Sequence, residues 1–358
     1  MRTFRVELGP RSHPVHVGAG ILDRLGELAV EAGIKPTRAA LISDTNVAPL
    51  FANPVQTALR KSGFEVTTIE IAAGESSKNL EMLNAVYDRM IDTELDRNSV
   101  VFGLGGGVVG DLAAFAAATF LRGIAMVQVP TTIVGQVDSA LGGKTAVNHR
   151  RGKNLIGAFS QPRMILADVA TLKTLPDREF REGLAEVIKY GVIMDAPMIA
   201  DLERDLDAIL ARDLNTLEAV VERSLRHKAH VVENDEREGG LRKILNFGHT
   251  VGHAIEASAG YGNYLHGEAV AIGMIAALRL SHLEAGLPTG DVQRVTTLIA
   301  RAGLPSEMPR KWNTADFIAA LRLDKKRVED GVEFVLVDAL GHALTKKLSF
   351  NTITSALG

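Results

Sequence analysis

The chain has 358 residues, a formal net charge of −3, 46% apolar residues and no cysteine. This length favours two domains, and the slightly acidic balance argues against a general nucleic-acid-binding protein. Without cysteine the chain has no disulfides or thiolate metal sites, so any transition metal would be bound by His, Asp or Glu.

The N-terminus lacks the apolar core of a signal peptide. The most apolar region, residues 100–121, is interrupted by a glycine cluster and by Asp111, which is not the pattern of a membrane span. We therefore expect a cytoplasmic protein with neither a membrane nor a nucleic acid as partner.

Strands and helices alternate through the first half of the chain. This alternation predicts an α/β domain over residues 1–176, with a parallel sheet covered on both faces. The expected strands lie at 6–17 (a strand or hairpin), 39–44, 65–71, 100–104, 126–129 and 164–169, and the expected helices at 21–32, 47–61, 79–91 and 112–121.

A glycine-rich segment follows one of these strands and leads into an apolar helix. Its Gly105, Gly107 and Gly110 satisfy G-x-G-x-x-G, in which backbone N–H groups approach a phosphate at the positive end of a helix. The signal is weak alone, because it does not follow the first strand and no acid lies about twenty residues further on. We favour nucleotide binding, with Asp44 as a candidate for a ribose hydroxyl. The alternative is a tight turn required by helix packing.

Two more polar segments follow predicted strands, Gly74 to Lys78 and Pro130 to Thr132. Ligands of open parallel sheets bind beyond the carboxyl ends of the strands, where these loops are expected. Ser and Thr also start helices, so each loop alone has a structural explanation. Residues 142–145, Gly-Gly-Lys-Thr, resemble the end of a P-loop, but Asp138 replaces its first glycine, so we reject an ATPase.

The second half of the chain, residues 177–358, is expected to be a mostly α-helical domain. Predicted helices lie at 182–194, 197–210, 214–233 and 268–285, and two short strands at 332–337 and 343–348. Lys228 lies on the apolar stripe of the third helix. It would either meet an anion or extend its stem to the surface, and the pattern leaves both open.

Histidines and a carboxylate in this half are candidates for a metal site. His249 and His253 are four residues apart and would stack on one helical face, so spacing alone nominates them as a ligand pair. His266 follows, and Glu186 lies upstream, three residues before Lys189. One carboxylate and two imidazoles form the ligand set of a catalytic zinc with an open fourth position.

Six motifs together are specific enough to indicate a family. The chain resembles the 3-dehydroquinate synthase family, within the sugar-phosphate cyclase superfamily, over nearly its full length. Single motifs also occur in related cyclases, and the glycine loop occurs in iron-type polyol dehydrogenases. The motifs are Gly-Gly-Gly-Val-Val-Gly-Asp, Val-Asp-Ser-x-x-Gly-Gly-Lys-Thr, Gly-Lys-Asn, Gly-Leu-Ala-Glu-Val-Ile-Lys, Leu-Asn-x-Gly-His-Thr-x-Gly-His-Ala-Ile-Glu and Leu-His-Gly-Glu-x-Val-Ala-x-Gly-Met.

The resemblance implies roles for individual residues. It assigns a Zn²⁺ site, with Co²⁺ as an alternative, to Glu186, His249 and His266, and leaves His253 for substrate contact or proton handling, oriented by Glu238. It implies an NAD site formed by Asp44, Asn46, Glu75, Lys78, Gly107, Val108, Val109, Gly110, Asp111, Thr131, Thr132, Lys144, Lys153, Thr171, Leu172, Lys173 and Thr174. It implies a substrate site formed by Asp138, Lys144, Asn154, Lys189, Lys228, Glu238, Arg242, Asn246, His253, Lys325, Lys326 and Arg122. In the family the last of these comes from the neighbouring subunit, which implies a homodimer.

The implied activity is that of a phosphate-eliminating carbon–oxygen lyase. It converts 3-deoxy-D-arabino-heptulosonate 7-phosphate to 3-dehydroquinate and phosphate in the shikimate pathway of aromatic amino-acid biosynthesis. The substrate carries a carboxylate and a phosphate, which would explain a local cluster of cations in an acidic protein. The competing hypotheses are a metal-dependent polyol dehydrogenase, a related cyclase acting on another sugar phosphate, and a non-catalytic NAD-binding regulator.

Overall fold

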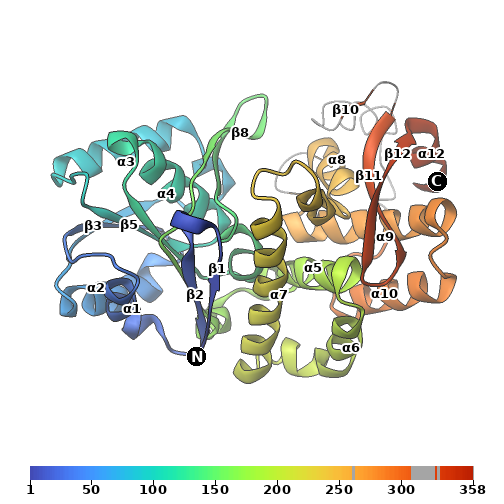
Figure 1. The fold of residues 1–358 in the computed structure, drawn as a ribbon, viewed down its shortest axis with the longest axis horizontal. Coiled ribbons are helices and arrows are strands. Elements are labelled where there is room, and N and C mark those ends of the chain that lie inside the picture. Colours follow the sequence, from blue (N-terminus) through green and yellow to red (C-terminus); the bar gives the residue numbers. More distant parts are fainter. Residues whose placement is uncertain (260–262, 308–326, 329–330, 358) are drawn as a thin grey trace. The chain divides into compact units, whose positions relative to one another are not determined.

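The structure is a computed structural model, and it describes residues 1–259, 263–307, 327–328 and 331–357 (Figure 1). The chain forms two compact units, which we call the first and second units. The first comprises Met1–Leu175 with Leu214–Glu233, and the second comprises Pro176–Asp213 with Asn234–Gly358. The expected boundary between the domains 1–176 and 177–358 lies close to the first boundary between the units, at Leu175 and Pro176. The units differ from the expected domains because the later segment Leu214–Glu233 belongs to the first unit.

A seven-stranded sheet forms the centre of the first unit. Its order is β1-β2-β9-β6-β5-β3-β4, and every neighbouring pair is parallel except the β1–β2 hairpin. The parallel sheet and the opening hairpin confirm the predicted fold class. The strands are β1 (Arg2–Val6), β2 (His13–Gly18), β3 (Arg38–Asp44), β4 (Glu65–Ile71), β5 (Val100–Gly105), β6 (Ala125–Pro130) and β9 (Met164–Asp168).

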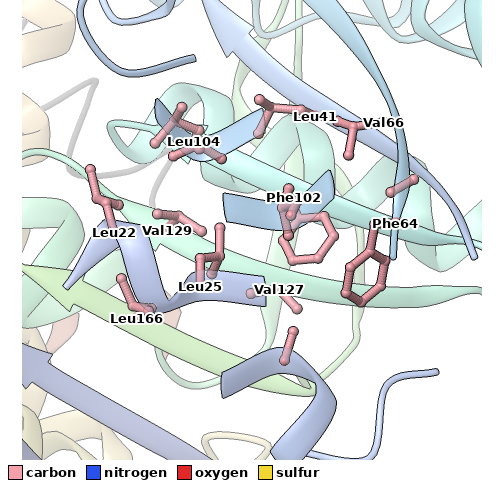
Figure 2. Close-up of a cluster of buried hydrophobic side chains, with 14 of the residues drawn as sticks. Leu22, Leu25, Leu41, Phe64, Val66, Phe102, Leu104, Val127, Val129 and Leu166 are labelled. Atoms are coloured by element: carbon pink, nitrogen blue, oxygen red, sulfur yellow. The ribbon is translucent and has the colours of Figure 1, made fainter. Parts of the chain in front are cut away.

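Helices cover both faces of this sheet. α1 (Leu25–Glu31) and α2 (Ala48–Lys61) pack on one face, and α3 (Leu80–Asp92) and α4 (Gly107–Thr119) pack on the other (Figure 1). Successive strand residues point to opposite faces, so Leu41 joins the first core and Ile42 the second. Both faces are buried, which is why these strands read as continuous apolar runs. Figure 2 shows the first core, in which the rings of Phe64 and Phe102 pack edge to face.

A hairpin in the first unit was not expected from the sequence. β7 (Lys144–His149) pairs with β8 (Gly152–Phe159) in antiparallel fashion, and a π-helical turn, η5 (Gly135–Ser139), precedes it. The residues of β8 are mostly exposed or half-buried, so they lack the apolar alternation that would have identified a strand. Short 3₁₀ turns complete the unit: η1 (Gly9–Arg11), η2 (Leu22–Arg24), η3 (Glu75–Ser77), η4 (Phe120–Arg122) and η6 (Val169–Thr174).

Helix α7 (Leu214–Asn234), up to Glu233, belongs to the first unit. Polar contacts join it to the N-terminal hairpin, because Arg2 pairs with Glu218 and Glu222 and the Glu7 N–H donates to Glu233.

The second unit is mostly helical, as expected. Its helices are α5 (Asp177–Met194), α6 (Ala196–Leu210), η7 (Leu241–Asn246), α8 (His249–Ala259), α9 (His266–Ala285), α10 (Thr289–Arg301) and α12 (Phe350–Leu357). A small antiparallel sheet accompanies them, formed by β10 (Arg327–Val328), β11 (Gly331–Ala339) and β12 (His342–Ser349). Within the described ranges, no helix combines the length and apolarity needed to cross a membrane.

Glycines allow α5, α8 and α9 to approach closely. A Cβ atom on Gly273 of α9 would lie 2.0 Å from the carbonyl oxygen of Gly248, just before α8. A Cβ on Gly267, in the first turn of α9, would lie 1.9 Å from the carbonyl oxygen of Glu182 on α5. Side chains at these positions would force the helices apart, so the glycines determine how near the helix starts can come.

Candidate active site

Glu186, His249 and His266 converge from three helices of the second unit. Glu186 is fully buried on α5, and the two histidines are the first residues of α8 and α9. Glu186 Oε1 lies 3.5 Å from His249 Nε2 and 3.4 Å from His266 Nε2. Glu182 and Glu186 share one face of α5, so the contact of Glu182 with Gly267 also brings Glu186 to the start of α9.

These separations fit a shared metal ion better than direct hydrogen bonds. An N–H···O bond spans about 2.7–3.2 Å. Ligands bound tetrahedrally to zinc at about 2.0–2.1 Å lie about 3.3–3.4 Å from each other. His249 Nδ1 lies 3.2 Å from the Phe247 carbonyl oxygen, a contact that directs Nε2 toward Glu186. The donor set and its spacing therefore fit a divalent cation such as Zn²⁺ or Co²⁺.

His253 does not belong to the group formed around Glu186. Its ring centroid lies 5.4 Å from that of His249 and 6.1 Å from that of His266, and its side chain is exposed. The structure groups it instead with Glu256 and His266. The pair His249 and His253, nominated by spacing, is therefore not the arrangement found. The geometry agrees with the set that the family resemblance implied.

Burial and the neighbouring carboxylates shift the pKa values of the two histidines in opposite directions. Burial lowers the pKa of His249 well below its usual value. Burial also acts to lower the pKa of His266, but contacts with Glu186 and Glu256 outweigh it and raise that pKa to about 10. Lys189, only 1% exposed, forms an ion pair with Glu186. A cation bound between these groups would therefore displace a proton from His266.

Further predicted substrate residues of the second unit lie around η7. Arg242 is buried, with its backbone N–H donating to Asp235 and its guanidinium donating to the Glu236 carbonyl oxygen. Asn246 donates to Glu238 Oε1 over 2.7 Å. The predicted orientation of His253 by Glu238 stays a prediction. Lys325 and Lys326 lie outside the described residues.

In the first unit, the loops predicted to bind NAD follow the carboxyl ends of parallel strands. Asp44 ends β3, where its Oδ1 accepts the N–H groups of Asn46 and Val47 over 2.9 and 3.0 Å, which is a structural role by itself. Thr131 and Thr132 follow β6, and η6 follows β9 with Thr171, Leu172, Lys173 and Thr174. These positions confirm the expected placement of the loops, whereas nucleotide contact stays a prediction.

The glycine segment is consistent with both explanations considered for it, nucleotide binding and helix packing. Helix α4 starts at Gly107 and its first bond joins the Gly110 N–H to the Gly106 carbonyl oxygen, so helix geometry leaves the N–H groups of Gly107, Val108 and Val109 at an open helix end. A Cβ on Gly105 would lie 2.7 Å from Val109, and one on Gly110 would lie 2.9 Å from Gln128. Packing thus explains two of the glycines, and the helix start remains suited to a phosphate.

A polar network around the buried Lys78 adjoins the start of α4. Lys78, 5% exposed, donates to Asp111 over 2.5 Å and to Asn154 over 2.6 Å. The β7–β8 hairpin is bound to the same loop, because Asn148 donates to Glu75 over 2.6 Å. The unexpected hairpin thereby brings together residues that the sequence placed in separate NAD and substrate groups.

Lys228 meets an anion, as one of the two hypotheses for it required. Its ammonium lies 2.7 Å from Asp138 Oδ1 and it is 5% exposed, so its stem does not extend to the surface. The anion found is a carboxylate of the first unit itself. Lys144 and Arg122 are exposed and Lys153 is half-buried, and Arg122 has a φ of 71° in a strained turn.

Sequence reasoning gave no role to several buried or half-buried polar residues near these groups. Gln136 donates to the carbonyl oxygens of Pro130 and Asp168 and to Thr171 Oγ1, and so joins the loops after β6 and β9. Glu182 accepts the Gly267 N–H at the start of α9, and Glu256 lies beside His266. The available signal was their position, because Glu256 ends one of the six motifs and Gln136 and Glu182 directly precede two others. A motif does not state what a side chain contacts.

Comparison with known proteins identifies the family. A family model described as 3-dehydroquinate synthase N-terminal matches residues 68–182, and one described as 3-dehydroquinate synthase C-terminal matches residues 183–327. A 3-dehydroquinate synthase of Desulforamulus reducens is 52% identical over 341 residues, which are 95% of each chain.

Solved structures extend the similarity to cyclases with other products. A 2-deoxy-scyllo-inosose synthase complexed with carbaglucose-6-phosphate, NAD⁺ and Co²⁺ is similar with a TM-score of 0.91, at 27% identity over 99% of each chain. A 2-epi-5-epi-valiolone synthase from Streptomyces hygroscopicus subsp. jinggangensis with NAD⁺ and Zn²⁺ bound gives a TM-score of 0.88, at 28% identity, and covers 98% of this chain and 96% of that chain.

These comparisons agree with the fold and with the site. The two family models meet at residue 182, and together they cover strands β5, β6 and β9 of the first unit and the Glu186, His249 and His266 cluster. The resemblance inferred from six motifs is confirmed: the chain belongs to the 3-dehydroquinate synthase family.

Proposed function

We propose that the chain is a 3-dehydroquinate synthase, a phosphate-eliminating carbon–oxygen lyase. It would convert 3-deoxy-D-arabino-heptulosonate 7-phosphate to 3-dehydroquinate and phosphate by transient oxidation, elimination, reduction and intramolecular aldol closure. The observation that carries this proposal is the convergence of Glu186, His249 and His266 in a chain of this family.

The cofactors of this reaction would be NAD and one divalent cation. The solved relatives with NAD⁺ and Co²⁺ or Zn²⁺ support this assignment. We assign the cation, Zn²⁺ or Co²⁺, to the cluster around Glu186, and NAD to the loops beyond β3, β4, β5, β6 and β9. When bound, NAD accepts and returns a hydride at one substrate carbon, while the cation polarises the oxygen on that carbon.

The chain's own residues would bind the two anionic groups of the substrate and handle protons. Cationic side chains suit the carboxylate and the phosphate, and planar guanidinium groups suit bidentate capture. His253, exposed beside the metal cluster, is suited to shuttle the hydroxyl proton, with Glu238 orienting it. The residues we assign to the substrate are Asp138, Lys144, Asn154, Lys189, Lys228, Arg242, Asn246, Lys325 and Lys326.

We further propose that the protein acts as a cytoplasmic homodimer in which Arg122 serves the site of the neighbouring subunit. An exposed arginine in a turn with φ angles of 49° at Leu121 and 71° at Arg122 supports this role, because strained turns of this kind persist where they position a functional side chain.

One experiment separates this function from the rival hypotheses. Protein, NAD, Zn²⁺ and the heptulosonate 7-phosphate are mixed, and phosphate release is followed together with absorbance of NADH. The proposal predicts phosphate release without accumulating NADH. Steady NADH formation without phosphate would indicate a polyol dehydrogenase, and neither product would favour a non-catalytic NAD-binding protein.

Two controls make the result specific. In the first, glucose 6-phosphate replaces the heptulosonate as a sugar phosphate without a carboxylate, and phosphate release from it alone would favour a cyclase that acts on another sugar phosphate. A metal chelator should abolish the activity, and Glu186→Ala should do the same, because both remove the cation from its site.

A further inference from the structure

Glu256 has no place in the metal set or the substrate set described above. It lies on α8 one turn beyond Gly252, it is 6% exposed, and its Oε2 lies 3.7 Å from Nδ1 of His266. Nε2 of the same ring lies 3.4 Å from Glu186. The His266 ring therefore stands between two carboxylates, one facing each of its nitrogens.

If the cluster holds a single cation at Glu186, His249 and His266, Glu256 is not one of its ligands. His253, Glu256 and His266 have the donor atoms of a second metal set. If both sets held an ion, His266 would bridge them through both ring nitrogens, and the ring would have to lose its second proton and become an anionic imidazolate. A neutral imidazole that binds one cation through Nε2 keeps a proton on Nδ1, and that proton needs an acceptor. Glu256 is positioned to be that acceptor.

We propose that Glu256 is a positioning residue that orients the His266 ring and makes Nε2 a better ligand for the cation. This inference rests on the proposed function, because it assumes a metal at Glu186, His249 and His266. A carboxylate behind a ligating imidazole fixes the tautomer and the ring orientation and raises the basicity of the ligand nitrogen. The separation of 3.7 Å should shorten to hydrogen-bond length when the cation binds.

His249 shows a contrasting arrangement in the same cluster. Its Nδ1 lies 3.2 Å from the Phe247 carbonyl oxygen, a neutral acceptor supplied by the backbone. The two imidazoles thus have different supports, and only the support of His266 can be removed by changing a side chain. This difference makes the role of Glu256 testable without disturbing a ligand.

The test is a Co²⁺ titration of the whole protein without NAD or substrate, followed by the visible d–d absorption of the bound ion. Glu256→Ala should weaken Co²⁺ binding about 10- to 100-fold relative to wild type, and should change the d–d spectrum. Glu256→Gln preserves size and an acceptor oxygen, so it should retain part of the affinity. Equal thermal unfolding midpoints of the two metal-free variants and wild type would exclude misfolding as the cause.

Two control variants decide between the alternatives. Glu333→Gln removes a half-buried carboxylate that pairs with Lys243 in the same unit, and should leave Co²⁺ affinity unchanged. His253→Ala should change the affinity less than threefold, with one ion bound per chain. Wild-type affinity in both Glu256 variants would overturn the proposal. So would an equal loss in His253→Ala, which would make Glu256 and His253 ligands. Failure of wild type itself to bind Co²⁺ would instead contradict the proposed function.

Discussion

The buried pair of Glu186 and Lys189 makes a quantitative prediction about the metal-free protein. Glu186 is fully buried, and Lys189 is 1% exposed. Lys189 contacts the carboxylate and lies 5.4 Å from the Tyr190 ring centroid. Glu186 also faces His266, whose pKa is raised to about 10, so at pH 8 the carboxylate has a second cation beside it. The two members of the pair therefore differ in what they lose when the other is removed.

The magnitudes follow from this asymmetry. Glu186→Met leaves the Lys189 ammonium buried and without its carboxylate, and removing one partner of a buried pair costs about 3–5 kcal/mol of unfolding free energy. Lys189→Met should cost less, about 1–2 kcal/mol, because His266 still neutralises Glu186. The double variant should be more stable than Glu186→Met alone, since replacing both charges by apolar groups of similar size is often neutral.

The assay is urea unfolding of all four proteins at pH 8 in the presence of a chelator. Equal losses for the two single variants would show that His266 does not stabilise Glu186. A double variant no more stable than Glu186→Met would show that the two charges are not coupled, and would refute the reasoning. Both variants that lack Glu186 should also fail to bind Co²⁺ whatever their stability.

Three further predictions concern groups outside the metal set. Gln136→Leu removes donors to three loop acceptors, and should cost about 1–3 kcal/mol of unfolding free energy and weaken NAD binding in a fluorescence titration; unchanged NAD affinity would refute a role for this residue in holding the loops. Gly267→Ala places a Cβ 1.9 Å from the Glu182 carbonyl oxygen, and should lower the free energy of unfolding by about 1–3 kcal/mol and weaken Co²⁺ binding. The control Gly290→Ala, which has nothing within 4 Å of its Cβ, should change neither. Burial lowers the pKa of His13. Below pH 6.5 the unfolded chain therefore binds a proton at His13 that the folded protein does not bind, and the free energy of unfolding decreases as the pH is lowered. Between pH 7.5 and 5.5, His13→Gln should therefore lose up to about 1.4 kcal/mol less stability than wild type in urea unfolding, and an equal loss would contradict the burial of a neutral His13.

Local patterns predicted the sheet of the first unit well. β4 was expected at Glu65–Ile71 and is found there, because alternation of apolar and polar residues is a property of the strand itself. β7 and β8 were missed, because the residues of β8 are exposed or half-buried and lack a regular apolar alternation, although Val147 of β7 lies in the second core. The contact from Asn148 to Glu75 joins segments far apart in the sequence, and no local pattern reports it.

The candidate metal site shows the same limit. Periodicity placed His249 and His253 on one helical face, yet neither of the two groups with ligand spacing contains both of them. His249 groups with Glu186 and His266, and His253 groups with Glu256 and His266. Their proximity depends on how near α5 and α8 approach α9, which Gly267 and Gly273 permit. The set implied by the motif resemblance matches this group, because motifs carry information about three-dimensional packing that spacing lacks.

The most direct test of the central claim is anomalous diffraction at the zinc absorption edge from crystals of the zinc-loaded protein. We predict one strong peak per chain, with Glu186, His249 Nε2 and His266 Nε2 as its protein ligands at about 2.0–2.2 Å. A peak bound instead by His253 and Glu256, or no ordered peak near Glu186, would contradict the account.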